Sequence, residues 1–170
     1  MSGNRQYRME VPVLPQSLDA FVALPGADLS SPWTTAGLTV VALCAYPTHR
    51  DAALAMLNHL KGPSPLSTYE KQFMVDRMRG KDYLPLSYFV GATPQNNYTP
   101  TQPLALIVED SPHSYVEQAA GYIQLFVRSG GADAPRPIKL RSKPSTGQWF
   151  LWEQMLLSDI RIPVAEDPWN

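Results

Sequence analysis

Cysteine and histidine are scarce in this sequence of 170 residues, which has one cysteine, Cys44, and three histidines. A single thiol cannot form a disulfide within the chain, so a disulfide framework is excluded. The histidines, His49, His59 and His113, are scattered and lack the spacing of metal ligands. The sequence therefore predicts neither a metal site nor a cofactor.

Long apolar runs and a strong charge of one sign are also missing. The longest apolar stretch, 36–46, is about half the length of a membrane-spanning helix, and the polar N-terminus lacks the apolar core of a secretory signal. Fourteen basic and fifteen acidic side chains give a net charge of -1. This balance argues against a dedicated nucleic-acid or membrane-surface protein. We therefore expect a cytoplasmic protein without a membrane partner, and nucleic acid is not a favoured partner.

The chain does have a sizeable apolar fraction and an excess of proline. Hydrophobic residues make up 44% and charged residues 17%, values that exclude intrinsic disorder. Seventeen of the 170 residues are proline, about twice the average share, which predicts fixed turns and extended loops. No repeat or linker divides the sequence, so we expect a single domain over 1–170.

Helical signals dominate residues 31–80. Ser31 before Pro32 predicts a helix start, a second helix should open at Thr48, and the run from Ser67 to Glu70 is a capping box for a third. Apolar residues at helical spacing follow each start, so three amphipathic helices are expected. Lys61 would end the second helix as a cation at its negative terminus, followed by glycine and proline.

The remaining segments are predicted as extended arms, loops and strands. Residues 1–30 form an extended arm in which Met9, Val11 and Val13 alternate as in an edge strand, and Ser17 caps a short turn. The Tyr/Pro-rich loop 81–103 has little periodicity. Alternation predicts strands within 104–155, at 104–108, 122–128, 137–142 and 148–153, the last two forming a hairpin. The tail 156–170 should be irregular, with Trp169 as an anchor.

Helices followed by strands predict an α+β fold, with about three helices packed against a C-terminal antiparallel sheet of about four strands. The same order is faintly similar to cystatin-like folds. That is an analogy of fold and carries no function.

No cluster of residues predicts catalysis. Cys44 could pair with His49 as a nucleophile, but it lies in an apolar helical stripe, where a free cysteine packs as a small hydrophobe. We expect His49 and His59 on the surface. His113 lies close to Asp110 and a serine, but turn chemistry is the favoured interpretation because triads assemble from separate elements. The glycine-containing run 129–132 is interpreted as a turn, not a phosphate loop.

Aromatic residues are the strongest candidates for binding. Tyr88, Phe89 and Tyr98 on the loop, with Trp149 and Trp152 on the last strand, could line a groove for a peptide or small molecule. Because Trp149 and Trp152 are three residues apart, they face opposite sides of a regular strand, and at most one can line such a groove. Equally, these rings could form the core under the loop.

Basic residues also concentrate in one region. Lys139, Arg141 and Lys143 share one strand face, with Arg128 and Arg136 expected nearby. Such a face could meet an acidic partner or a phosphate. The favoured alternative is that cations on an exposed strand prevent edge-to-edge association.

Several short strings occur in an order that is specific: Gly91-Ala92-Thr93-Pro94, Asn96-Asn97-Tyr98-Thr99-Pro100, Arg128-Ser129-Gly130-Gly131-Ala132-Asp133 with Pro135-Arg136, Gln148-Trp149-Phe150-Leu151-Trp152-Glu153 and Asp167-Pro168-Trp169. They resemble a family of small proteins from anaerobic Gram-positive bacteria that is known only as a domain of unknown function. The resemblance covers about residues 31–170. It implies a bacterial, non-secreted, single-domain protein and brings no activity or catalytic residue.

From the sequence we predict a non-catalytic binding or protein-interaction module, whose surface is the Tyr/Pro-rich loop and the basic strand face. The alternative is a small-molecule pocket or enzyme between helices and sheet, with Glu109, Asp110 or His113 as acid–base groups. A third hypothesis is phosphate or nucleic-acid binding through the basic strand face.

Overall fold

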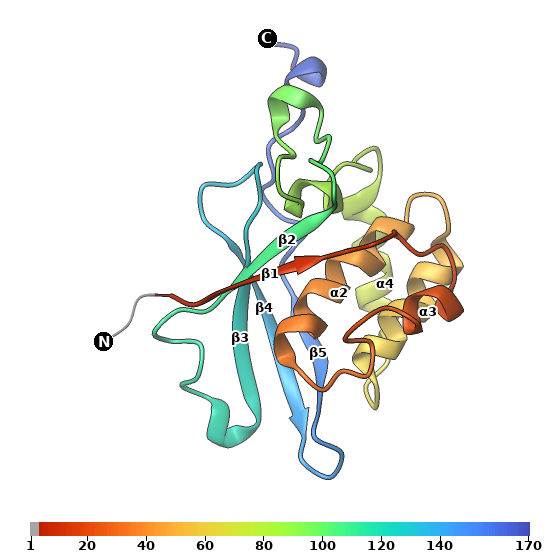
Figure 1. The fold of residues 1–170 in the computed structure, drawn as a ribbon. Helices are drawn as coiled ribbons and strands as arrows, with labels where there is room; N and C mark the ends of the chain where they lie inside the picture. The colour runs from red at the N-terminus through yellow and green to blue at the C-terminus, as the bar shows by residue number, and fades with distance from the viewer. Residues whose placement is uncertain (1–3) are drawn as a thin grey trace.

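One antiparallel sheet organises the molecule, with its strands in the order β1–β2–β3–β4–β5 (Figure 1). The computed structural model describes residues 4–170, so residues 1–3 of the predicted arm lie outside the described residues. Within that range the strands are β1 (Gln6–Glu10), β2 (Ala105–Glu109), β3 (Tyr122–Val127), β4 (Arg136–Lys143) and β5 (Gln148–Gln154). The helices are α1 (Leu18–Val22), α2 (Pro32–Ala45), α3 (Arg50–Lys61) and α4 (Thr68–Met78).

This architecture confirms the predicted α+β class, with five strands where about four were expected. The additional strand is β1, which comes from the N-terminal arm and pairs with β2, so that Met9 lies opposite Leu106. The arm is not extended throughout, because it contains the short helix α1, which Ser17 caps by accepting a hydrogen bond from the Ala20 N–H. The predicted hairpin is confirmed as β4 and β5.

Helix α2 is the centre of the core. It packs on the sheet with one side and on α3 with the other, and ten of its 14 residues are buried. The prediction of an amphipathic helix was wrong here, since a helix that is covered on all sides is apolar all round. Ser31 caps its start, as the sequence indicated.

Helices α3 and α4 form the outer layer. The start of α3 differs from the prediction, and the start of α4 agrees with it. The N-cap of α3 is His49, without a side-chain cap bond, and Thr48 instead contacts the His49 ring. The capping box of Ser67 and Glu70 at the start of α4 is present in both directions. Helix α4 buries only Met74 and Met78, so core residues leave much of its surface towards β5 uncovered.

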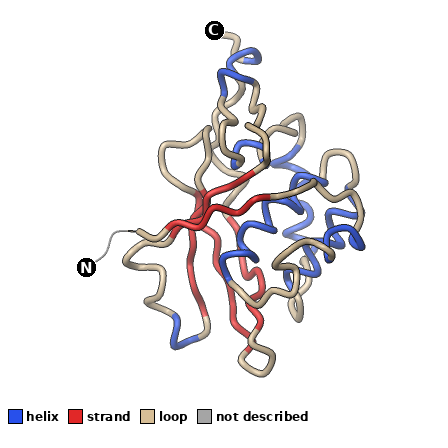
Figure 2. Tube along the Cα trace, in the orientation of Figure 1, coloured by secondary structure: helices blue, strands red, loops and turns tan. Residues whose placement is uncertain are grey.

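The helices cover one face of the sheet only. In the described part of the chain no α-helix lies on the opposite face (Figure 2). The loop 81–103 and the tail gather at the end of the molecule where the C-terminus lies, and the short 3₁₀ helices Pro94–Asn96 and Val164–Glu166 touch there. Leu156, Leu157 and Ile160 anchor the tail, whereas Trp169 is 93% exposed and is not the anchor that the sequence suggested. None of the helices within residues 4–170 has the length and apolar character that a membrane span requires.

Candidate functional site

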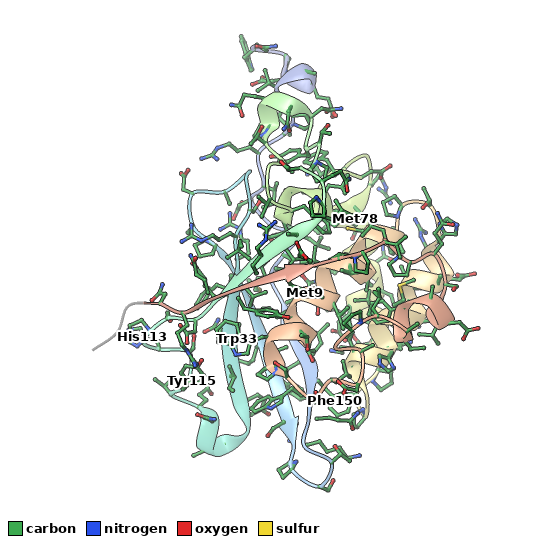
Figure 3. All side chains as sticks on the ribbon, in the orientation of Figure 1. Met9, Trp33, Met78, His113, Tyr115 and Phe150 are labelled. Carbon is green, nitrogen blue, oxygen red and sulfur yellow. The ribbon has the colours of Figure 1, made fainter. Side chains whose placement is uncertain are left out.

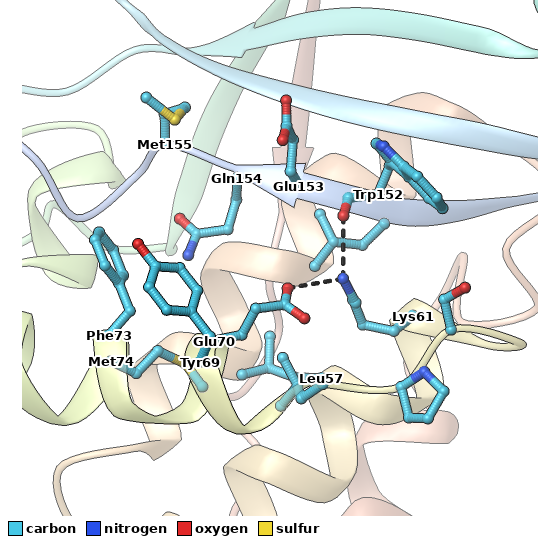
Figure 4. A pocket seen from close by; sticks show the side chains of 14 residues that line it. Leu57, Lys61, Tyr69, Glu70, Phe73, Met74, Trp152, Glu153, Gln154 and Met155 are labelled. Atoms are coloured by element: carbon cyan, nitrogen blue, oxygen red, sulfur yellow. Dashed lines mark hydrogen bonds and ion pairs between the residues drawn. The ribbon is translucent and has the colours of Figure 1, made fainter.

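A groove of about 600 Å³ lies between α4 and β5 (Figure 4). Its existence follows from the sparse packing of α4, which leaves one helix face opposite the edge strand of the sheet. Volumes of this size are typical of small-ligand sites. The apolar lining comes from α3, α4, β5, the loop between the two helices and the residue that follows β5: Leu57, Pro65, Leu66, Tyr69, Phe73, Met74, Leu151, Trp152 and Met155.

Lys61 and Glu70 form the polar part of this groove. Lys61 Nζ donates to Glu70 Oε2 at 2.8 Å and to the Trp152 carbonyl oxygen at 3.0 Å, although the Lys61 side chain is only 6% exposed. Burial acts to raise the pKa of Glu70, but the hydrogen bonds from Lys61 and from the Ser67 backbone outweigh it and hold that pKa below its ordinary value. The ion pair therefore fixes the end of α3 and the start of α4 to the edge of β5.

A second hollow of about 350 Å³ adjoins the groove between the end of α3 and the β4–β5 hairpin. We call it the cationic pocket, because Lys61, Arg141 and Lys143 line it and, among the described residues, no carboxylate does. Phe150 closes its wall against Gly62, whose φ of +60° and contact with the ring leave no room for a side chain. The two hollows share Lys61, Ser64, Leu151 and Trp152.

Trp152 forms the wall between the hollows, and Trp149 does not contribute to it. The pairing of β4 with β5 passes from Leu151 to Glu153, so Trp152 has no partner in the register. The Trp149 side chain packs against the hydrophobic core instead, and its carbonyl oxygen accepts from Thr35 of α2. The prediction that at most one of the two tryptophans lines a groove agrees with this arrangement, and the residue is Trp152.

The basic residues named from the sequence have different surroundings. Arg128 pairs with Glu109 at 2.9 Å, and Lys139 pairs with Glu117 at 3.1 Å. Arg136 donates to the carbonyl oxygens of residues 134, 158 and 159, so it holds the tail in place. Arg141 lies over the rings of Tyr122 and Trp152, at 5.3 and 4.8 Å. Neither Arg141 nor Lys143 has a carboxylate partner within residues 4–170. Of the basic residues named from the sequence, these two line the cationic pocket, beside Lys61.

Tyr88 and Tyr98 lie in the core and not on a binding surface. Each is 1% exposed, and their hydroxyls donate to the carbonyl oxygens of Leu156 and Arg161 in the tail. Burial and the neighbouring Tyr83 raise the pKa of Tyr98 to about 12. The structure therefore corrects the placement of these two rings in a groove and favours the alternative, in which they form the core under the loop.

The acid–base groups considered for an enzyme do not converge on either hollow. His113 is exposed on the loop after β2, away from α3 and α4 (Figure 3). Glu109 and Asp110 are buried, but each is paired, with Arg128 and Arg5 respectively. Within the described residues no group of three potential metal ligands occurs.

Cys44 and the remaining histidines have structural surroundings. Cys44 packs against the core, and burial raises the pKa of its thiol, as expected for a small hydrophobe. His49 lies at the start of α3 and is half-buried, where the sequence predicted the surface. His59 is half-buried, not on the surface as predicted, because its ring contacts Phe21 and the Ala27 carbonyl oxygen.

The run 129–132 packs closely against the loop at residues 92–93. A Cβ at Gly130 would collide with the carbonyl oxygen of Ala92, and the Gly130 N–H donates to the Ser87 carbonyl oxygen. The glycine is needed for this close approach of two backbones. The prediction of a turn is correct, and the turn is a packed one.

The sequence did not single out the residues that make the groove polar. Lys61 and Glu70 were both visible, but each was explained by a local role, as a helix-end cation and as a capping partner. Their contact joins two helices to a strand 91 positions away, at Trp152. Tyr69 and Phe73 counted only among the apolar residues at helical spacing after the start of the third predicted helix, and the exposed ring of Tyr69 carried no separate signal.

Comparison with family models places the chain in a family described as "Domain of unknown function (DUF6935)", which matches residues 13–164. The match covers most of the 170 residues, so the chain belongs to this family, as the resemblance in its sequence indicated. Comparison with curated proteins and with solved structures gave no match. The cystatin-like analogy therefore stays a prediction.

Proposed function

For this member of the family, we propose a non-catalytic binding module whose site is the groove along β5 together with the cationic pocket. A bacterial and cytoplasmic setting belongs to the same proposal. The family resemblance supports the first and the lone cysteine the second. The ligand is a small molecule or a short segment of a partner protein that enters the two hollows.

The observation that carries the proposal is that two hollows of different chemistry adjoin and share part of their lining. Lys61 and Trp152 line both, so a single ligand can contact an apolar surface and a cationic one at once. At the rim, Tyr69 is 76% and Met155 53% exposed. Large exposed apolar side chains that gather at the mouth of a groove indicate a binding surface, whereas single exposed apolar residues scattered over a surface do not.

The polar groups in the groove support binding in preference to catalysis. Lys61 is held by two acceptors and Glu70 by two donors, so both are already engaged in hydrogen bonds. A general acid or base must be free to reach a substrate proton. Their arrangement instead fixes the shape of the site before a ligand arrives, which lowers the entropic cost of binding.

A thermal-shift screen of the whole chain tests this proposal. Pools of organic acids, nucleotides and short peptides would be compared on the wild type, Trp152→Ala and the control Trp169→Ala, which removes an exposed indole outside the groove. A ligand at a hundred times its Kd adds about 2.7 kcal/mol, or several degrees for a chain of this size. We expect hits that Trp152→Ala loses and Trp169→Ala keeps.

Two results would contradict the proposal. One is a set of hits that all persist in Trp152→Ala, which would place the site elsewhere. The other is the absence of any hit across the three classes. Tyr69→Ala guards against a folding artefact, because its side chain is mostly exposed and its loss should weaken the same hits without lowering the Tm of the free protein.

A further inference from the structure

We infer that the ligand of this site is an amphipathic organic anion, whose anionic group lies in the cationic pocket and whose apolar group lies in the groove between α4 and β5. This inference rests on the proposed function and adds the chemical class and the orientation of the ligand. It follows from how charge, hydrogen-bond donors and apolar surface are distributed over the two hollows.

Charge is segregated between the two hollows. The cationic pocket is lined by Lys61, Arg141 and Lys143, whereas the carboxylates of Glu70 and Glu153 belong to the lining of the groove. Glu70 neutralises Lys61, which leaves Arg141 and Lys143 as the uncompensated charges. An anionic group is therefore attracted to the cationic pocket and repelled from the groove, and this fixes one orientation for the ligand.

Donors without acceptors occur at the same place. A lysine ammonium group has three N–H donors, and Lys61 uses two of them, for Glu70 and for the Trp152 carbonyl oxygen. Among the described residues Arg141 has no hydrogen-bond acceptor, so its planar fork is open to a carboxylate or a related oxyanion. An anionic group in the cationic pocket can therefore accept from donors that no group of the described chain uses.

Arg141 is also held in position before a ligand binds. Its guanidinium lies 5.3 Å from the Tyr122 ring centre and 4.8 Å from that of Trp152, and these two rings pack edge to face at 5.6 Å. Stacking on aromatic rings orients the guanidinium without using its N–H donors. A cation fixed in this way loses little freedom on binding an anion.

The groove accepts the rest of the ligand. Tyr69, Phe73 and Met74 form an apolar wall on α4 that faces β5, and Met155 follows the end of β5 across the groove (Figure 4). Methionine and aromatic side chains adapt to rings and chains of different shape, so this wall suits an aryl or alkyl group. A purely ionic ligand such as inorganic phosphate would leave it uncovered.

Three probes with one carbon skeleton test the inference: phenylbutanoate, phenylbutanol and phenylbutylamine. Their Kd values would be measured by titration calorimetry with the full chain at low and at physiological salt. We expect the anion to bind about tenfold more tightly than the alcohol, a difference of about 1.4 kcal/mol, and the amine to bind most weakly. Added salt should weaken binding of the anion and leave binding of the alcohol unchanged.

Substitutions of two arginines on the same sheet test whether Arg141 causes the preference for the anion. Arg141→Gln should raise the Kd of the anion by about tenfold and leave the Kd of the alcohol unchanged. Arg141→Lys keeps the charge and should retain part of the preference. Arg8→Gln is the matched control, because Arg8 is an exposed arginine on β1 at the opposite edge of the same sheet.

The outcomes separate this inference from the proposed function. If the alcohol or the amine binds as tightly as the anion, and binding still depends on Trp152, the ligand class is wrong and the binding site stands. If Arg8→Gln weakens binding of the anion as much as Arg141→Gln does, the anionic group does not lie in the cationic pocket. If none of the three probes binds, the ligand class is contradicted, and the proposed function is then judged by the thermal-shift screen alone.

Discussion

Lys61 and Glu70 are nine residues apart in the sequence and lie on different helices, and the ammonium nitrogen of one lies 2.8 Å from a carboxylate oxygen of the other. The two side chains differ in exposure, since that of Lys61 is 6% and that of Glu70 36% exposed. Because Lys61 also donates to the Trp152 carbonyl oxygen, the pair links α3, α4 and β5. The width of the groove therefore depends on a contact that is mostly buried on its lysine side.

Glu70→Gln should destabilise the protein by about 1–2 kcal/mol at pH 7. Glutamine keeps the capping box of α4, so the loss reports the carboxylate charge that compensates the buried ammonium group. Water screens the half-exposed Glu70 and keeps the cost below that of a fully buried pair. Denaturant unfolding measures it. Equal stability of the variant and the wild type would show that the pair contributes nothing.

The same substitution should remove a dependence of stability on pH. The folded state lowers the pKa of Glu70, so its contribution is complete above the ordinary glutamate value of about 4.3 and is lost as the pH falls through the folded pKa. The difference between the wild type and Glu70→Gln should be constant from pH 7 to about pH 5 and shrink below it. A difference that grows on acidification would contradict this assignment.

Tyr98→Phe should cost about 1 kcal/mol of stability and leave ligand binding unchanged. The substitution removes the hydrogen bond of 2.6 Å to the Arg161 carbonyl oxygen and keeps the ring that stacks on Tyr83. Tyr69→Phe is the control, since its exposed hydroxyl has no partner among the described residues and its loss should not change the Tm. A Tyr98→Phe variant of normal stability that fails to bind phenylbutanoate would return Tyr98 to the binding surface.

Asp110→Asn should destabilise the edge strand β1 by about 2 kcal/mol at neutral pH. The Asp110 carboxylate accepts from the Arg5 backbone N–H at 2.7 Å, from Arg5 Nε at 3.0 Å and from the Tyr115 hydroxyl at 2.7 Å. Burial acts to raise the pKa of Asp110, but these bonds lower it below its ordinary value. Asp82→Asn, at an exposed position after α4, serves as the control.

The direction of that pKa shift sets the pH range of the effect. A carboxylate with a lowered folded pKa stabilises the protein above the ordinary aspartate value of about 3.9 and loses this contribution as the pH falls through its folded pKa. Amide exchange of β1 should therefore be faster in Asp110→Asn than in the wild type at pH 7, with the gap narrowing towards pH 3. Unchanged exchange at pH 7 would contradict the role of Asp110.

Local signals in the sequence predicted the elements, and contacts between distant elements decided the site. The cap of Ser31, the capping box of Ser67 and the alternation in β3 and β4 depend on neighbouring residues, so they could be interpreted directly. The alternation of Met9, Val11 and Val13 indicated an edge strand, but no local pattern specifies that residues 6–10 pair with residues 105–109.

The candidate site shows the same division. Arg141 was named as a binding residue, and of the two tryptophans on the last strand Trp149 was preferred to Trp152, because aromatic and basic side chains on a predicted strand carry a signal that does not say which face they occupy. Tyr88 and Tyr98 carried an equal signal but are buried, since the tail after β5 folds back over the loop and accepts from their hydroxyls. The groove itself depends on how loosely α4 packs, a property of the tertiary structure that residue types do not report.

The four tryptophans allow a direct test of the central claim, which is that the ligand site lies along β5. Their indole N–H signals would be followed by NMR during titration of the full chain with phenylbutanoate, after assignment by single substitutions. Our account predicts that the Trp152 signal shifts and saturates, while those of Trp149, on the other side of the strand, and of the exposed Trp169 stay in place. A titration in which the Trp152 signal remains still, or in which Trp149 moves instead, would contradict it.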